Sequence, residues 1–348
     1  MARSFRALVV DKQGDGVSLA EQAWTEAQLL PGEVTIRVLY SSVNFKDALA
    51  VRADGRVARR YPLVPGIDLA GTVETSADAR FAPGDAVLVH GYDLGVSHHG
   101  GYAELARVPA DWVVPLPPGL TARQAMALGT AGFTAGLSVD RLEHMGLRPE
   151  GGPVLVTGAS GGVGSTAIAM LAARGYEVVA STGSADAHAY LRELGAQQIL
   201  DRAETSAASE RPLEAMRWAG AVDAVGGATL AYLLRTMRFG GSIALSGNTG
   251  GAAVQTTVFP FILRGANVLG IDSVNLPMAQ RVALWQRLAT DLRPPRLEES
   301  ITHEVTLADT PAVLADIYRG ATRGRVVVRV SGPGASASTE PPGTRATR

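Results

Sequence analysis

The sequence predicts an α/β protein in which a doubly wound parallel sheet is inserted into a barrel-like β domain. Three observations carry this prediction. Residues 5–114 hold short strand patterns separated by Pro-Gly and Gly-Asp turns. Residues 154–272 hold six strand patterns separated by helical segments, as a complete doubly wound sheet of two mononucleotide-binding halves requires. A last strand pattern lies at 325–330, and we expect it to fold back onto the N-terminal domain.

The composition is that of a globular protein without an overall charge field. Of 348 residues, 46% are hydrophobic and 19% are charged, and the formal net charge is -1. We therefore expect about two domains and neither nucleic acid nor a membrane as partner. Arg3 and Arg6 interrupt the apolar character of the N-terminus, which is not that of a signal peptide, so we expect a cytoplasmic protein.

The absence of cysteine narrows the chemistry. It excludes disulfides, thiolate nucleophiles and zinc sites built on cysteine ligands. The six histidines include no H-x-x-x-H pair. We therefore expect no metal site.

The N-terminal domain is predicted to be antiparallel. Residues 33–40 alternate polar and apolar side chains, as a half-buried strand does. A proline-rich run at 115–118 ends the domain, and a helical pattern at 121–128 leads through a Gly/Thr-rich link at 129–134 towards the parallel sheet. The predicted strands of this domain cover residues 5–10, 33–40, 65–73, 83–89, 100–108 and 112–114.

The parallel sheet is organised around a strand at 154–157 that opens into a glycine-rich turn at 158–164. Helix formers follow at 165–174, and a second strand follows at 177–181. This strand–helix–strand unit places free backbone N–H groups at a helix N-terminus, where they bind a pyrophosphate. A Rossmann dinucleotide site is therefore predicted.

The glycine pattern itself is imperfect. Gly161 and Gly164 match the last two glycines of G-x-G-x-x-G, but Ala159 replaces the first, and a tight turn without a ligand is the alternative. The flanking strands and helix favour the dinucleotide site. The second strand ends in Ser181-Thr182-Gly183-Ser184, without the carboxylate that would bind a ribose 2′-hydroxyl and repel a 2′-phosphate. The sequence therefore favours NADP(H) over NAD(H).

Domain borders follow from these patterns. We predict a substrate domain from residues 1–124 and 275–330, a nucleotide-binding domain from 125–274, and a disordered tail at 331–348, rich in Ser, Gly, Pro, Ala and Thr. The remaining predicted elements are strands at 197–201, 221–225, 242–246 and 267–272, a helix at 278–292 and the closing strand at 325–330.

An ordered set of motifs connects these elements to a known family. The motifs are Asn44-Phe45-Lys46-Asp47 and the segments 65–68, 129–134, 156–165, 222–227, 257–264 and 270–273. Together they resemble the zinc-free medium-chain dehydrogenases/reductases, specifically the YhdH-like acryloyl-CoA reductase group of the quinone oxidoreductase branch. The resemblance runs from about residue 5 to residue 330. It implies a GroES-like β-barrel substrate domain, a Rossmann domain that binds NADPH, a cleft between them and a homodimer.

The resemblance also implies a reaction. Zinc-dependent relatives carry a catalytic cysteine and Gly-His-Glu where this chain has Gly66-Ile67-Asp68, so a Lewis acid is not available to polarise a carbonyl. We expect NADPH-dependent reduction of the carbon–carbon double bond of a short enoyl-CoA, acryloyl-CoA to propanoyl-CoA, by hydride transfer to the β-carbon. A reductase of quinones or small enones is the alternative, and a non-catalytic NADPH-binding protein is a more remote one.

The catalytic candidates follow the strand that ends near Tyr40. They are Asn44, Lys46 and Asp47: Asn44 as a donor to cofactor or substrate, and Lys46, held by Asp47, as an ammonium facing the enolate. A capping asparagine followed by a solvated ion pair is the alternative. The family often has tyrosine where this chain has Phe45, so water or another group must protonate the α-carbon if that phenol is the usual donor.

The resemblance assigns the cofactor to residues on both sides of the cleft. The family commonly has arginine in place of Ser184, and Arg202 matches a family arginine that reaches the same phosphate, although a solvated surface arginine is a nearly equal alternative. Arg325 is expected at the pyrophosphate, whereas Asp223 is expected to bond to backbone. The full set is Phe45, Ser160, Gly161, Gly162, Val163, Gly164, Ser165, Ser181, Thr182, Gly183, Ser184, Arg202, Gly247, Asn248, Asp272 and Arg325.

A basic loop is the candidate substrate anchor. Four arginines surround a glycine turn at residues 52–60, and Arg59 and Arg60 are the predicted ligands of the CoA phosphates. Arginine binds phosphate through a planar fork that lysine lacks. A solvated basic loop is the alternative.

Overall fold

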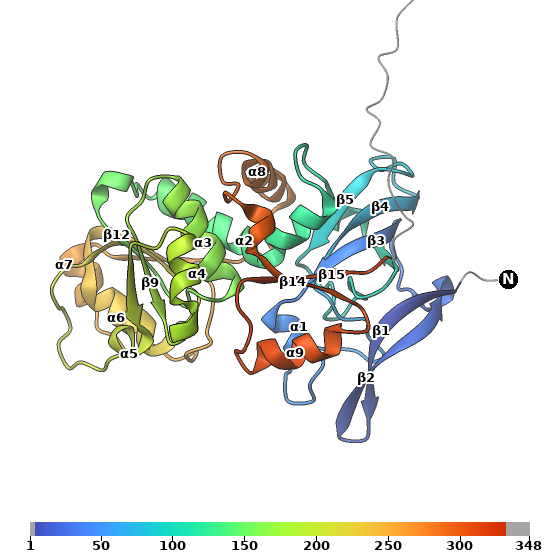
Figure 1. The fold of residues 1–348 in the computed structure, drawn as a ribbon, viewed down its shortest axis with the longest axis horizontal. Helices are drawn as coiled ribbons and strands as arrows, with labels where there is room; N and C mark the ends of the chain where they lie inside the picture. The colour runs from blue at the N-terminus through green and yellow to red at the C-terminus, as the bar shows by residue number, and fades with distance from the viewer. Residues whose placement is uncertain (1–3, 332–348) are drawn as a thin grey trace, which may run out of the picture.

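Two sheets of six and seven strands organise the computed structural model, which describes residues 4–331 (Figure 1). They lie at opposite ends of the molecule, with helix α2 (Ala122–His144) between them. The predicted tail at 331–348 falls outside the described residues, apart from Ser331. No helix within residues 4–331 is both long enough and apolar enough to cross a membrane.

The six-stranded sheet is parallel throughout and has the order β10-β9-β8-β11-β12-β13. In chain order this is 3-2-1-4-5-6, the doubly wound arrangement in which a dinucleotide lies where the order reverses. All six predicted strands are present, which confirms the predicted fold class. Their bounds are β8 Val154–Val156, β9 Val178–Thr182, β10 Gln198–Asp201, β11 Trp218–Asp223, β12 Met237–Leu245 and β13 Asn267–Gly270.

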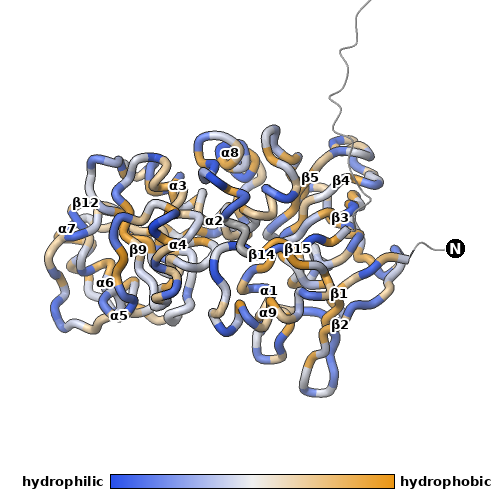
Figure 2. The backbone as a smooth tube through the Cα atoms, viewed as in Figure 1, coloured by the Kyte–Doolittle hydropathy of each residue, from blue (hydrophilic) through white to orange (hydrophobic). Residues whose placement is uncertain are grey.

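Helices cover both faces of this sheet. In Figure 1, α3 and α4 lie on one side of the strands and α5 and α6 on the other. The buried strands are almost entirely apolar, as a sheet covered on both faces requires, and Figure 2 shows this hydrophobic character along β9. The helices are α3 Gly162–Ala173, α4 His188–Glu193, α5 Arg202–Thr205, α6 Gly227–Thr236 and α7 Phe259–Arg264.

The seven-stranded sheet joins the two ends of the chain. β15 (Arg325–Arg329) pairs antiparallel with β3 (Val34–Ser42) and parallel with β14 (Ile301–Thr306), so the closing strand returns to the N-terminal part as predicted. β1 (Ser4–Gln13) and β2 (Gly16–Thr25) form a separate hairpin; β2 is mostly exposed and shows no alternating pattern that predicts it. The other strands are β4 Asp68–Ser76, β5 Ala86–His90, β6 Leu105–Val108 and β7 Val114–Pro115.

Short helices complete this half of the molecule. α1 and α9 pack against each other beneath the sheet, and α8 packs against α2 (Figure 1). The predicted helix at 278–292 is present but ends earlier. These helices are α1 Phe45–Ala50, α8 Met278–Ala289 and α9 Thr310–Tyr318.

The prediction of a link at 129–134 is wrong, because these Gly/Thr-rich residues belong to helix α2. The chain stays helical to His144 after a kink at Gly129, whose φ of 52° and ψ of -159° interrupt the helix. A β-carbon at Gly129 would lie 2.6 Å from polar atoms of Ser42, Asp68 and Arg325. The low helix propensity of this stretch is overridden because it is buried between the two sheets. The hydrophobic core around α2 accordingly includes Leu88 and Val327 of one sheet together with strands of the other.

Candidate active site

The glycine turn, residues 158–164, has the geometry that a pyrophosphate needs. Gly158 has a φ of 59°, and a β-carbon at Gly164 would lie 2.5 Å from the carbonyl oxygen of Gly158. Both positions therefore require glycine. Helix α3 begins directly after Gly161, so the free N–H groups of its first turn face the turn. Gly324 N, from the segment before β15, donates to the carbonyl oxygen of Ser160 at 3.1 Å.

The predicted adenosine loop, Thr182, Gly183 and Ser184, begins at the last residue of β9. Ser184 N donates to Thr182 Oγ1 at 3.1 Å, and that hydroxyl donates to Ser160 Oγ at 3.4 Å, so the loop lies beside the glycine turn. The hydroxyl of Ser181 is used within the protein, in a 2.6 Å hydrogen bond with Thr205.

Arg202 lies against this loop. A β-carbon at Gly183 would be 2.9 Å from Cζ of Arg202, so the guanidinium covers the backbone where glycine stands. Arg202 is exposed, and no carboxylate of the described residues lies within 4 Å of it. Its charge therefore faces the loop without an internal counter-ion, as a phosphate ligand would.

Gly247 and Asn248, two further predicted cofactor residues, follow the carboxyl end of β12. Asn248 is exposed, and a β-carbon at Gly247 would lie 2.1 Å from the carbonyl oxygen of Ala224. Asp223 accepts from Val225 N at 2.9 Å, from Gly226 N and from the Thr157 hydroxyl. Its predicted backbone-bonding role is confirmed.

A buried polar cluster joins the two halves of the molecule. We call Ser42, Asn44, Asp68, Thr130 and Arg325 the interdomain cluster. Asp68 accepts hydrogen bonds from Asn44 Nδ2 at 2.7 Å, from Thr130 N at 3.0 Å and from the hydroxyls of Ser42 and Thr130. It therefore caps the helical segment that restarts after Gly129. Three distant segments converge on one carboxylate.

Arg325 completes the cluster from β15. Its Nη2 donates to Ser42 Oγ at 2.8 Å, its Nη1 to Asn44 Oδ1 at 3.3 Å and its Nε to the carbonyl oxygen of Ala127 at 3.0 Å. Nη2 also lies 4.0 Å from Asp68 Oδ2. The side chain is buried, and burial lowers the pKa of Arg325. Its Nη1 would lie 3.0 Å from a β-carbon at Gly162, so it stands directly behind the glycine turn.

Asn44 has a different environment from the one expected. Its Nδ2 donates to Asp68 and its Oδ1 accepts from Arg325, so both ends of the amide are engaged inside the protein. Its backbone fixes the start of α1, because Asn44 N donates to Asp47 Oδ2 at 2.8 Å and the Asn44 carbonyl oxygen accepts from Asp47 N at 3.0 Å. In this arrangement Asn44 joins the start of α1 to Asp68 and Arg325.

The expected pairing of Lys46 with Asp47 is wrong. Successive residues of a helix point in different directions, and Asp47 turns inward while Lys46 stays half-buried. Asp47 accepts from Asn44 N at 2.8 Å and from Ile67 N at 2.9 Å. Burial, reinforced by the nearby carboxylate of Asp68, raises the pKa of Asp47 to about 7.

The charge of Lys46 acts on Asp272, which follows β13 of the parallel sheet. Burial raises the pKa of Asp272, but hydrogen bonds from Asn275 and from backbone N–H groups, with the charge of Lys46, bring it below its usual value. Lys46 and Asp272 thus interact across the boundary between the two halves. The Phe45 ring, beside Lys46, is 41% exposed and stacks on Tyr318 with ring centroids 6.2 Å apart.

The basic loop divides into a paired and an unpaired part. Arg52 forms an ion pair with Asp54 and covers the Tyr318 ring at 3.9 Å. Arg59 and Arg60 are exposed, and within the described residues no carboxylate lies within 4 Å of either.

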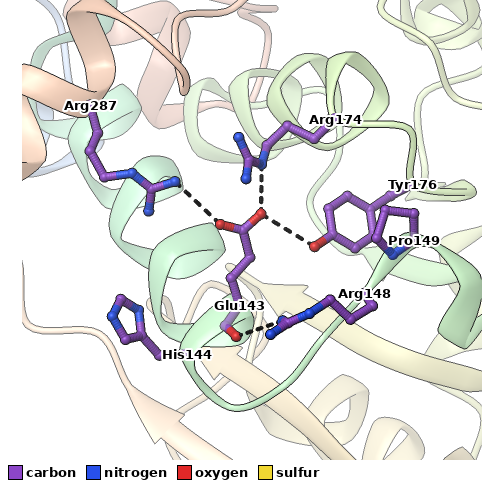
Figure 3. Close-up of a pocket in the computed structure, with 7 residues that line it drawn as sticks. All are labelled: Glu143, His144, Arg148, Pro149, Arg174, Tyr176 and Arg287. Atoms are coloured by element: carbon purple, nitrogen blue, oxygen red, sulfur yellow. Dashed lines mark hydrogen bonds and ion pairs between the residues drawn. The ribbon is translucent and has the colours of Figure 1, made fainter.

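A separate hollow of about 520 Å³ lies near the end of α2 and contains none of the predicted site residues (Figure 3). Figure 3 shows Glu143 at its centre, paired with Arg174 at 2.6 Å and Arg287 at 3.3 Å and receiving a hydrogen bond from Tyr176. These contacts tie α2 to α3 and α8. Its arginines are thus held by internal partners, and we assign the hollow a structural role.

Sequence reasoning missed most of the interdomain cluster. Ser42, Asp68 and Thr130 bond to partners far away in the chain, such as Asn44 to Asp68 over 24 residues and Arg325 to Ser42 over 283. Asp68 carried a usable signal, since it is the one acidic residue in the apolar segment 62–73. Its fully buried position follows from that pattern.

The His, Asp and Glu side chains of the described residues do not form a metal site. The chain has no cysteine, and among the residues that the structure describes no group of three or more His, Asp or Glu side chains is arranged to hold an ion. No step of the chemistry is therefore assigned to a metal.

Comparison with known proteins matches both halves. Residues 30–118 match the alcohol dehydrogenase GroES-like domain and residues 162–289 the zinc-binding dehydrogenase domain. The acrylyl-CoA reductase AcuI of Ruegeria pomeroyi is 53% identical over 329 residues, 94% of this chain and 99% of that protein. The putative quinone oxidoreductase YhfP of Bacillus subtilis is 50% identical over 330 residues, 95% of this chain and 100% of that protein.

Solved structures match as well. The crystal structure of the yhdH oxidoreductase from Salmonella enterica in complex with NADP has a TM-score of 0.91 and 48% identity, and covers 94% of this chain and 100% of that one. The crystal structure of Bacillus subtilis yhfP with NAD bound has a TM-score of 0.92 and 50% identity, with the same coverage.

Proposed function

The chain belongs to the medium-chain dehydrogenase/reductase family, in the group of the acrylyl-CoA reductases and related quinone oxidoreductases, and on that premise we propose that it is an NADPH-dependent enoyl-CoA reductase. Its membership confirms the resemblance seen in the motifs. The proposed reaction reduces acryloyl-CoA to propanoyl-CoA in the cytoplasm, where both NADPH and CoA thioesters are available. The proposed substrate domain comprises residues 1–124 and 275–330, and the nucleotide-binding domain residues 125–274.

The observation that carries the cofactor assignment is the adenosine loop. It has no carboxylate, and Arg202 covers Gly183 with an exposed guanidinium. A carboxylate here would select NAD(H), whereas an arginine favours the 2′-phosphate of NADP(H). The Salmonella relative was crystallised with NADP, which supports the proposal, and the NAD in the Bacillus relative makes cofactor preference a property to measure.

The proposed chemistry divides between cofactor and protein. When bound, NADPH supplies the hydride that adds to the β-carbon. Negative charge then develops on the thioester oxygen, and Lys46 is the proposed cation facing it, since no carboxylate of the described chain lies within 4 Å of its ammonium. The interdomain cluster positions α1, which carries Lys46, against the glycine turn. Because Phe45 has no dissociable proton and is partly exposed, we assign protonation of the α-carbon to water.

A substrate panel tests the function. NADPH oxidation is to be measured with acryloyl-CoA, crotonyl-CoA, a small enone and a benzoquinone, for the native chain and for Lys46→Ala. The expected result is the highest kcat/KM with acryloyl-CoA and a loss of about 100-fold in Lys46→Ala. Reduction of the quinone but not of acryloyl-CoA would establish the quinone reductase instead, and binding of NADPH without turnover of any substrate would establish the non-catalytic protein.

We propose that Arg59 and Arg60 hold the phosphates of CoA. Their lack of a carboxylate partner supports this, because an arginine pair without internal counter-ions attracts a phosphate. Arg59→Ala with Arg60→Ala is expected to raise KM for acryloyl-CoA about tenfold and to leave KM for a small enone unchanged. The matched control, Lys12→Ala with Arg141→Ala, removes two exposed charges elsewhere. Unchanged KM values in both variants would show that the basic loop is solvated and does not bind CoA.

We also propose a homodimer through the outer edge of the parallel sheet. β13 is one of the two edge strands of this sheet, and apolar side chains are exposed on α7, which precedes β13 in the chain, and on the segment before α7. An open strand edge beside exposed apolar side chains promotes aggregation unless it is paired. A second copy of the chain, related by a two-fold axis, would pair the edge and cover these side chains. The exposed residues are Val258 63%, Ile262 68% and Leu263 55%.

Sedimentation tests the dimer. Ile262→Asp with Leu263→Asp is expected to convert the dimer to a monomer, whereas Phe239→Asp, an exposed apolar residue outside α7 and β13, leaves it intact. A native chain that sediments as a monomer at micromolar concentration contradicts the proposal.

A further inference from the structure

The segment that leads into β15 passes both parts of the cofactor site. Gly324 N donates to the carbonyl oxygen of Ser160 in the glycine turn at 3.1 Å. The preceding residue, Arg323, extends towards the segment after the adenosine loop: its Nη1 lies 3.5 Å from the carbonyl oxygen of Asp186, and its Cζ lies 5.1 Å from the centre of the Tyr190 ring. One dipeptide thus connects the pyrophosphate turn to the adenosine end of the site.

Two arginines therefore approach residues 183–186 from different halves of the molecule. Arg202 lies against Gly183 within the nucleotide-binding half. Arg323 reaches Asp186, two residues after Ser184, from the half that carries the seven-stranded sheet. Ser184 itself offers only a hydroxyl and a backbone N–H, and that N–H is engaged with Thr182.

We propose that Arg323 is a second cationic ligand of the cofactor's 2′-phosphate, acting together with Arg202. This inference rests on the proposed NADPH dependence. A phosphomonoester carries a charge of about -1.5 to -2 near pH 7, so one arginine neutralises only part of it. A second guanidinium adds a bidentate, charge-assisted contact.

The Tyr190 ring prepares Arg323 for this role. A guanidinium stacked on an aromatic face is restricted in its rotamers, so binding a phosphate costs less side-chain entropy. The Asp186 carbonyl accepts from Nη1, which holds the guanidinium next to the segment that follows Ser184. NADH lacks the 2′-phosphate, so Arg323 stabilises NADPH alone and acts as a specificity determinant.

Cofactor titration without substrate tests the inference. The dissociation constants of NADPH and NADH are to be measured by nucleotide fluorescence for the native chain, Arg323→Gln and Arg323→Lys. We expect Arg323→Gln to raise the NADPH constant about tenfold, which corresponds to about 1.4 kcal/mol, and to change the NADH constant less than twofold. Arg323→Lys, which keeps the charge but loses the fork, should recover part of the affinity.

Matched variants isolate the contact. Arg319→Ala removes an exposed arginine that is paired with Asp316 on α9 and should leave both constants unchanged. Arg202→Ala with Arg323→Gln should bring the NADPH constant close to that of NADH. Thermal melting of each variant without cofactor should match the native chain.

Two results overturn the assignment. Equal weakening of NADPH and NADH in Arg323→Gln places the side chain at the pyrophosphate or in the fold, and unchanged NADPH binding removes it from the site. Both are distinguishable from failure of the proposed cofactor, because in that case the native chain itself binds NADPH and NADH equally. The titration contains no acyl substrate, so its result does not depend on which enoyl thioester is reduced.

Discussion

The glycine turn and the interdomain cluster lie next to each other, yet they are built on different principles. The glycine turn uses backbone: positive φ at Gly158, close approach of Gly164 and free N–H groups at the start of α3. The interdomain cluster uses side chains from β3, β4, α2 and β15 that converge on Asp68. A backbone site tolerates changes of its neighbours, whereas a buried network fails as a unit.

The largest effect is expected from breaking the cluster at Asp68. Asp68→Ala leaves the buried Arg325 without its nearest carboxylate and removes the cap of the α2 segment after Gly129. Removing one partner of a buried pair costs about 3–5 kcal/mol. Urea denaturation should show a loss of this size, and kcat should fall because α1 loses its position.

Asp223 is the matched control for that comparison. It is equally buried but bonds to the hydroxyl of Thr157 and to nearby backbone N–H groups, with no arginine within 4 Å in residues 4–331. Asp223→Asn should cost about 1–2 kcal/mol. Asp68→Asn, the same substitution within the cluster, should cost more, because it removes the carboxylate charge beside Arg325. Equal losses for Asp68→Asn and Asp223→Asn would mean that the cluster has no special place in the fold.

The kink of α2 gives the next largest effect. Gly129→Ala places a β-carbon 2.6 Å from three polar atoms at a positive φ, so we expect a destabilisation of about 2–4 kcal/mol. Gly146→Ala, just after the same helix, also has a positive φ but meets nothing within 4 Å, and it should cost about 1 kcal/mol. Chemical denaturation of both variants measures the difference. Similar costs would show that backbone conformation alone requires Gly129.

These differences explain what the sequence could predict. The strand–turn–helix unit at 154–174 is a local pattern, and its order in the sheet follows from chain order, so the Rossmann half was predicted almost strand by strand. The helix over residues 129–134 is not predicted because the glycines and threonines of this stretch disfavour a helix in isolation, and burial between two sheets overrides that preference. The pairing of Lys46 with Asp47 was wrong because the partners of Asp47 are backbone atoms of Asn44 and Ile67.

A smaller effect is expected in the pH dependence of stability. The folded-state pKa of Asp47 is raised to about 7 from its ordinary 3.8, so between these values the folded chain binds more protons than the unfolded chain. Stability therefore falls as pH rises through this window, by at most about 1.4 kcal/mol per pH unit for one group. Asp68, Tyr102 and Arg325 are the charged or titratable groups that act on Asp47 or on its neighbours.

Asp47→Asn removes this contribution. Its free energy of unfolding, measured by urea titration at pH 5, 6, 7 and 8, should lose less with rising pH than that of the native chain. The free energy of unfolding of the native chain minus that of Asp47→Asn should therefore decrease from pH 5 to pH 8. Parallel curves would show that Asp47 is ionised throughout and that its hydrogen bonds outweigh burial.

The smallest effect, none at all, is expected from removing metal ions. The polar atoms of the cluster are engaged with one another: the carboxylate of Asp68 serves Ser42, Asn44 and Thr130. His90 lies nearby and is a possible metal ligand, but its Nε2 already accepts a hydrogen bond from Trp285 Nε1 at 2.9 Å. Burial and the charge of Arg281 lower the pKa of His90. Without cysteine, the thiolate ligands of a cysteine-based zinc site are missing. Activity should survive dialysis against EDTA and phenanthroline, under conditions that inactivate a zinc alcohol dehydrogenase, and elemental analysis should find no stoichiometric zinc. Loss of activity that zinc alone restores would mean that the cluster rearranges to expose its carboxylates, and would overturn the division between a backbone cofactor site and a closed side-chain network.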